Sequence, residues 1–225
     1  YGWYLNSRET LDTQLNVFER FEPKLSDRSR ACDLLFLANI QPELQSHVLD
    51  QCEEPKFVAL DSMNLWIETA RAALVDVIAR VDCVILNDAE LRQLTARPNL
   101  LGAARELLAL GPSVVVAKQG EYGAALITAE QFFSLPAYPL ETVVDPTGAG
   151  DTFAGGFLGH LARHLEQPPG GETLRQAMAY GTALASFNVE EFGTERIVRL
   201  TAEEIHARVE DLRRMTQFEH DPILV

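Results

Sequence analysis

The chain has 225 residues, of which 47% are apolar and 23% charged, a composition that predicts one soluble globular domain with a sizeable core. Its formal net charge of −14 leaves no basic stripe for nucleic acid or an anionic membrane, so we expect neither as a partner. The three cysteines lack metal-site spacing and no apolar run approaches membrane-spanning length, which favours reduced thiols and a cytoplasmic location.

The first half of the chain alternates short apolar runs with helical patterns. Residues 1–18 alternate enough to predict one or two exposed strands. Strands are then expected at residues 33–38, 56–60, 82–86 and 113–117. Helices are expected at residues 42–51, 65–81 and 89–110, the last broken near 97–99. Nearly continuous apolar strands that alternate with helices predict an α/β fold with a parallel sheet covered on both faces.

The second half changes pattern. Short strands are expected at residues 123–128, 131–134 and 137–144, joined by short connections that predict an antiparallel extension of the sheet. Three helices are then expected, at residues 151–166, 173–189 and 202–218. The stretch 145–157, DPTGAGDTFAGGF, joins these two parts and is the most distinctive of the chain.

This stretch combines a glycine-rich turn with a carboxylate. Gly148-Ala149-Gly150 provides the permissive backbone that a strand-to-helix turn needs, and Asp151 stands at the start of the helix. Amide groups at a helix N-terminus bind anions, yet a carboxylate there would repel a resting phosphate. A chemical role for Asp151, accepting a proton from an attacking hydroxyl, explains the combination. A simple helix N-cap is the alternative. The spacing fits neither a Rossmann fingerprint, because residue 153 is Phe, nor a P-loop.

The whole stretch resembles the C-terminal signature D-x-x-G-A-G-D-x-F-x-x-G of the ribokinase-like (PfkB) carbohydrate kinases. The resemblance implies a three-layer ribokinase-like α/β fold with a mostly parallel central sheet and a small β lid. It also implies ATP-dependent phosphorylation of an alcohol group of a sugar or nucleoside, with Mg²⁺. By the same resemblance, Asp151 is the catalytic base, and Gly148, Ala149 and Gly150 form the anion hole. Asp145 and Thr147 shape the loop and, with residues 192–194, lie where some relatives bind a monovalent cation such as K⁺.

Two further motifs follow predicted strands. Asn87-Asp88-Ala89-Glu90 resembles the family's N-x-x-E motif, whose glutamate organises Mg²⁺; helix capping by the same residues is the alternative. Lys118-Gln119-Gly120-Glu121-Tyr122-Gly123 stands where the family places a turn against the nucleotide. There Lys118 could reach a phosphate, and Gly120 and Gly123 would let the backbone approach it. A hairpin turn is the alternative and is compatible with that role.

The acceptor side is less defined. Asn39 and Asp61 follow predicted strands at the edge where open α/β sheets bind ligands, so either could contact a sugar hydroxyl or simply form a turn. Residues 1–18 resemble part of a lid that covers the acceptor and could support a homodimer, and residues 19–225 then form the nucleotide-binding part. The family's first strand-helix units have no counterpart before Tyr1, so we expect this chain alone to fold poorly or to need a partner.

Two other functions stay open from the sequence. One is a kinase of the same superfamily that acts on a pyridoxal-type or hydroxymethylpyrimidine alcohol, which an aromatic acceptor pocket would favour. The other is a non-catalytic sugar- or nucleotide-sensing module on the same fold. The presence of Asp151 together with the Asn87/Glu90 pair argues for the enzyme.

Overall fold

A six-stranded sheet forms the centre of the computed structural model, which describes residues 14–165 and 168–219. Its strands are β1 (Leu34–Leu37), β2 (Phe57–Asp61), β3 (Cys83–Asn87), β4 (Val114–Lys118), β5 (Ala124–Ile127) and β6 (Phe132–Leu135). They lie side by side in chain order, with β1 to β4 parallel and β5 and β6 antiparallel. Both the parallel sheet and its antiparallel extension are therefore as the sequence predicts.

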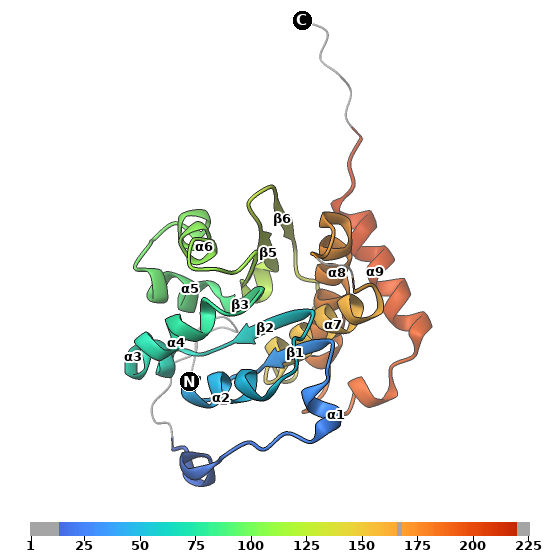
Figure 1. Ribbon diagram of the computed structural model, residues 1–225. Helices are drawn as coiled ribbons and strands as arrows, with labels where there is room; N and C mark the ends of the chain where they lie inside the picture. The colour runs from blue at the N-terminus through green and yellow to red at the C-terminus, as the bar shows by residue number, and fades with distance from the viewer. Residues whose placement is uncertain (1–13, 166–167, 220–225) are drawn as a thin grey trace, which may run out of the picture.

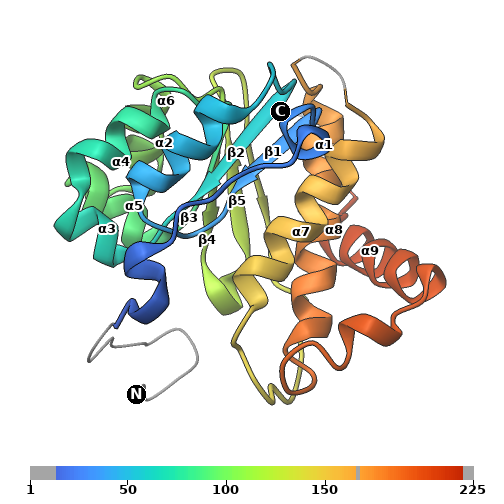
Figure 2. The same ribbon diagram turned by 60° about the horizontal axis from the view of Figure 1, so that its bottom comes forward.

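Helices cover both faces of this sheet (Figures 1 and 2). One face carries α2 (Pro42–Gln51), α3 (Asn64–Thr69), α4 (Arg71–Ile78), α5 (Asp88–Thr95) and α6 (Leu100–Leu108). The other carries α7 (Ala149–Arg163) and α8 (Gly171–Asn188), and α9 (Ala202–Thr216) packs on the outside of α8. Short helical segments complete the fold: η1 (Asn16–Arg20), α1 (Asp27–Arg30), η2 (Gly120–Tyr122) and η3 (Ile197–Arg199).

Alternate residues of each central strand supply two separate cores. Leu60 and Val84 pack toward the α2–α6 layer, with Leu74 among their neighbours. Ala59 and Ile85 belong to the cluster on the α7–α8 side. Because both faces of the strands are buried, their sequences are nearly continuous in apolar residues. The two layers fix the carboxyl ends of β2, β3 and β4 at one edge of the sheet, close to the start of α7.

Three expected elements differ from the structure. The helix expected at 65–81 is two helices, because Ala70 leaves the helical conformation (φ −136°) and joins α3 to α4. Residues 137–144, expected as a strand, form no strand and include bends at Glu141 and Val144; the stretch contains Pro139, which has no amide to donate, and the Val144 amide bonds Val189 O instead. Of the strands expected at 1–18, residues 16–20 form η1, and residues 1–13 lie outside the described part.

No helix in the described ranges has the length and apolar character needed to span a membrane.

Candidate active site

The glycine-rich loop ends in the first turn of α7. Gly148 is the N-cap residue, and its backbone is left-handed (φ 81°), a conformation that favours glycine. The first helical hydrogen bond runs from Thr152 N to Gly148 O at 2.8 Å. Among the described residues, the amides of Gly150 and Asp151 have no recorded acceptor, and the Asp151 side chain is exposed. Asp151 is therefore in the first helical turn and is not the N-cap, and it stands beside free amide donors.

A buried ion pair faces this loop from the sheet edge. Lys118, the last residue of β4, places Nζ 3.2 Å from Asp61 Oδ2 at the end of β2. The two side chains are 18% and 8% exposed. Lys118 Nζ also lies 3.2 Å from the position that a Cβ on Gly150 would occupy. Glycine at position 150 therefore lets the ammonium group approach the start of α7, where it adds positive charge to the helix terminus.

The carboxylates at this edge are poorly compensated. Burial raises the pKa of Asp61, the ion pair with Lys118 opposes that rise, and the charge of Asp151 adds to it. Burial also raises the pKa of Glu90, and the charge of Asp61 adds to it while Lys118 again opposes it. Asp61 thus interacts with both Asp151 and Glu90, and Lys118 is the cation that Asp61 and Glu90 share. An additional cation at this edge would be stabilised.

Asn87 and Glu90 form a capping box at the start of α5. Glu90 N donates to Asn87 Oδ1 at 2.8 Å, and Asn87 N donates to Glu90 Oε2 at 2.9 Å. Asn87 and Glu90 therefore cap the helix, as the alternative prediction has it. The part of the chain that is described contains no group of three or more His, Cys, Asp or Glu side chains arranged to hold a metal. Mg²⁺ commonly takes one or two carboxylates together with waters and substrate phosphates, so this edge still fits it.

The two glycines after Lys118 have different surroundings. Gly120 begins η2 with φ 58°, on the surface. Gly123 is buried with φ 99°, and a Cβ there would lie 2.0 Å from Leu135 O, so the β5–β6 pairing requires glycine at this position. The turn alternative thus explains Gly123 by itself. A nucleotide role for Gly120 and Gly123 stays a prediction.

Asp145 connects the loop to the segment after α8. Its Oδ1 accepts a hydrogen bond from Thr147 N at 2.9 Å, and its Oδ2 lies 3.5 Å from Gly193 N. The structure thus brings Asp145 next to Gly193, within the segment 192–194 named from the sequence. A monovalent cation at this place stays a prediction.

The two acceptor candidates lie at the ends of neighbouring strands but have partners of their own. Asn39 is exposed, and its Oδ1 accepts a hydrogen bond from Trp66 Nε1 at 3.0 Å. Asp61 is buried, accepting from Lys118 and, through Oδ1, from Ser62 N at 2.9 Å. Contact of either residue with a sugar hydroxyl stays a prediction. Most of the expected lid, and with it the expected dimer contact, lies outside the described residues.

One residue and one cluster of ion pairs near the loop were not predicted from the sequence. Asn188 at the end of α8 is 2% exposed and bonds the loop on both sides of Gly148, at Thr147 and Thr152. In the sequence it is a single asparagine at the end of a helix rich in small residues, and a single asparagine does not reveal its partners.

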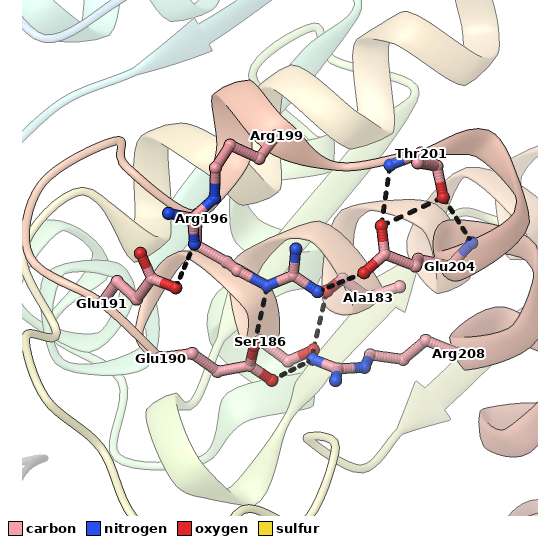
Figure 3. Close-up of polar contacts among 9 residues, drawn as sticks. All are labelled: Ala183, Ser186, Glu190, Glu191, Arg196, Arg199, Thr201, Glu204 and Arg208. Atoms are coloured by element: carbon pink, nitrogen blue, oxygen red, sulfur yellow. Dashed lines mark hydrogen bonds and ion pairs between the residues drawn. The ribbon is translucent and has the colours of Figure 1, made fainter.

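The cluster, here called the corner, consists of ion pairs among Glu190, Arg196, Glu204 and Arg208, where the chain turns after α8 (Figure 3). Glu190 accepts from Arg196 Nε at 3.2 Å and pairs with Arg208 Nη1 at 2.7 Å. Arg196 Nη2 also donates to Glu204 at 2.6 Å, and the Arg208 guanidinium lies 3.4 Å from the centre of the Phe187 ring. These contacts fix the segment that carries Gly193 against α8 and α9. Alternating charges along a chain do not show which of them meet, so only the structure reveals this corner.

The layered sheet and its polar strand edge define the class of protein, a ribokinase-like α/β fold. Solved structures with this arrangement include a nucleoside kinase from Methanocaldococcus jannaschii (TM-score 0.70, 20% identity, 87% of this chain and 60% of that one). Another is a fructokinase from Vibrio cholerae with fructose, ADP and calcium bound (TM-score 0.69, 20% identity, 88% and 64%).

The chain belongs to the pfkB family of carbohydrate kinases, whose sequence profile matches residues 14–199. A curated relative is the cytidine kinase of Thermococcus kodakarensis, 36% identical over 132 residues that make up 56% of this chain and 47% of that protein. The chain thus spans about half the length, or less, of the curated relatives described as cytidine and nucleoside kinases.

Proposed function

We propose that the protein containing this chain transfers the γ-phosphoryl group of ATP to an alcohol group of a sugar or nucleoside. The observation that carries the proposal is the start of α7, where free amides and the exposed Asp151 carboxylate stand together beside Lys118. An anion site that also holds a carboxylate suits a reaction in which a proton leaves as phosphoryl charge arrives. Family membership supports the same reaction class.

In this proposal Asp151 accepts the proton of the acceptor hydroxyl while that oxygen attacks the γ-phosphorus, and ADP leaves on the opposite side. The amides of Gly148, Ala149 and Gly150 would hold the phosphoryl oxygens in transit, and the Ala149 amide would give up its long bond to Pro146 O (3.4 Å) to do so. The Gly150 amide already lies in the first turn of α7, so it needs little reorganisation. Lys118 lies close enough to Gly150 to balance the added negative charge, and Asp61 holds the lysine side chain in place.

Glu90, with Asn87 beside it, would hold Mg²⁺ at this edge, where the ion would neutralise charge on the ATP phosphates. The raised pKa of Glu90 supports this assignment, because a carboxylate kept from water and close to Asp61 gains from a nearby cation. Asp145 and Thr147 are proposed to shape the loop and, together with residues 192–194, to hold a monovalent cation.

The acceptor is proposed to be a nucleoside or a free sugar, since relatives with those substrates in their names match the chain at 31–42% identity. Asn39 and Asp61 are candidates for contact with its hydroxyl groups. Purified protein should therefore be assayed with Mg²⁺-ATP against cytidine, aminoimidazole riboside and deoxyribose, with pyridoxal as the comparison alcohol.

Replacing Asp151 by Asn tests the mechanism. The amide keeps the shape of the side chain but cannot accept the hydroxyl proton, so kcat should fall by about 10²–10⁴-fold. ATP affinity, measured by calorimetry, should stay within about threefold because the amide donors remain. Asp211→Asn, on the outer helix α9, is the matched control and should leave both values unchanged. Wild-type turnover in Asp151→Asn would refute the base assignment, and no transfer to any alcohol by the wild type would refute the proposed function.

A further inference from the structure

The side chain of Asn188 links the two sides of the glycine-rich loop. Its Nδ2 donates to Thr147 O at 2.8 Å, and its Oδ1 accepts from Thr152 Oγ1 at 2.8 Å. Thr147 precedes Gly148, and Thr152 follows Asp151. One amide group therefore bonds the residues that flank the proposed anion hole and base.

The orientation of this amide is determined by its partners. Thr147 O can only accept a hydrogen bond, so the NH₂ group must face it and the Asn188 oxygen must face the Thr152 hydroxyl. Asn188 is 2% exposed, which leaves little room for water to replace either bond. The same amide lies 3.6–3.7 Å from the position of a Cβ on Gly148, so it also packs against the N-cap residue.

The neighbouring residue strengthens the connection. Val189 O accepts hydrogen bonds from Val144 N at 2.8 Å and from Asp145 N at 3.4 Å. The end of α8 thus holds the chain where it enters the loop, through Val189, and where it turns into α7, through Asn188. A glycine-rich turn has little intrinsic stiffness, so these bonds are what restrict its conformations.

We propose that Asn188 is a positioning residue for phosphoryl transfer. By holding Thr147 and Thr152 at a fixed separation, it aligns the amides of residues 148–150 and the Asp151 carboxylate before the substrates bind. This inference rests on the proposed function, because alignment matters only if the loop carries out transfer. Misplacement of such groups by about an ångström costs on the order of a hundredfold in rate.

Two substitutions of matched size test the role. Asn188→Asp replaces the donor to Thr147 O by a second acceptor, and Thr152→Val removes the hydroxyl without changing the shape of the side chain. Each should lower kcat at least about tenfold, with the KM for ATP within about threefold. Thr152→Ser keeps the hydroxyl and should retain kcat within about twofold. Thr182→Val is the control on α8: that hydroxyl is buried and has no recorded partner among the described residues.

Amide hydrogen exchange provides a readout that does not depend on activity. In Asn188→Asp and Thr152→Val, exchange should accelerate at the amide of residue 152, which donates to Gly148 O at 2.8 Å, while exchange in the middle of α7 and in β3 stays unchanged. A fall in kcat that only follows the folded fraction, measured by thermal unfolding, would overturn the inference. So would unchanged exchange at the amide of residue 152, or faster exchange there with wild-type kcat.

The same measurements separate failure of the inference from failure of the proposed function. If the wild type transfers phosphate to none of the alcohols tested, the proposed function fails, and with it the catalytic meaning of Asn188. If the wild type is active and Asn188→Asp keeps its kcat, the proposed function stands and the positioning role alone is refuted.

Discussion

Two capping boxes in this molecule have the same geometry and opposite electrostatics. Glu90 at the start of α5 and Glu204 at the start of α9 each accept a hydrogen bond from the backbone amide of their N-cap residue at 2.9 Å. Burial raises the pKa of Glu90. Hydrogen bonds from Thr201 and Arg196 lower the pKa of Glu204 to about 2. The motif therefore decides where each helix begins, but the neighbouring residues decide what its carboxylate can do.

The two glutamates differ in how their charge is compensated. Glu204 shares the guanidinium of Arg196 with Glu190, so its charge is compensated within the protein. Glu90 instead shares a single ammonium group, that of Lys118, with the buried Asp61. Carboxylates left under-compensated at the edge of a sheet suit a cation that arrives with a ligand. This contrast favours the magnesium role at α5 and a structural role at α9.

Removing Lys118 should have the largest effect on stability. Lys118→Met leaves Asp61 buried without its cation, which should cost about 2–3 kcal/mol at pH 8. Because the pKa of Asp61 is already raised and would rise further, its protonated form would dominate at lower pH. The loss should therefore be smaller at pH 5 than at pH 8. Urea unfolding at the two pH values measures it.

Lys56 provides the control for this prediction. Its ion pair with Asp33 joins side chains that are 52% and 66% exposed, so Lys56→Met should change stability little. An equal loss in both variants, or a loss at Lys118 that does not depend on pH, would remove the difference between the strand edge and the surface.

The sequence predicted which residues lie at the same edge of the sheet better than it predicted which of their side chains make contact. Asp61, Asn87 and Lys118 could be placed at one edge because parallel strands end on the same side. The ion pair between Asp61 and Lys118 could not be predicted, because it joins residues 57 positions apart. The break at Ala70 was missed for a related reason: alanine favours helix, and tertiary packing overrides that preference.

The same limit applies to the loop. The sequence signature predicted the start of α7 to within two residues, and the glycines predicted the turn before it. Asn188, which bonds Thr147 and Thr152, comes from a helix 36 residues or more away, and one amide carries no pattern. Repeated local features are visible in a sequence, whereas single long-range partners are not.

Removing Arg196 tests the compensated side of the comparison and should have an intermediate effect. Arg196→Met breaks the pairs with Glu190 and Glu204 and the contact with the Phe187 ring at 4.8 Å. Because the arginine side chain is only 17% exposed, we expect a loss of about 1–2 kcal/mol in thermal unfolding. Arg213→Met, at a side chain that is 55% exposed and paired with Glu210, should change stability little. A similar loss in both would mean that burial of the corner contributes nothing.

The smallest effects should come from the two glutamates themselves, and they should have opposite signs. Glutamine can replace glutamate in a capping box, so Glu90→Gln and Glu204→Gln change the charge and keep the cap. The raised pKa of Glu90 means that stability is lost as pH rises through that pKa. Glu90→Gln should therefore match the wild type near pH 4 and melt roughly 2 °C higher at pH 7.5.

Glu204 follows the reverse rule. Its pKa of about 2 lies below the ordinary value of 4.5, so its contribution is present above pH 4.5 and disappears toward pH 2. Glu204→Gln should thus melt below the wild type at pH 7.5 and approach it in acid. Adding Mg²⁺-ATP should reverse the sign at Glu90 only, because a bound cation would stabilise the wild-type carboxylate and not the amide. Two variants that shift in the same direction, or a Glu90→Gln advantage that survives Mg²⁺-ATP, would mean that the two capping boxes are electrostatically equivalent.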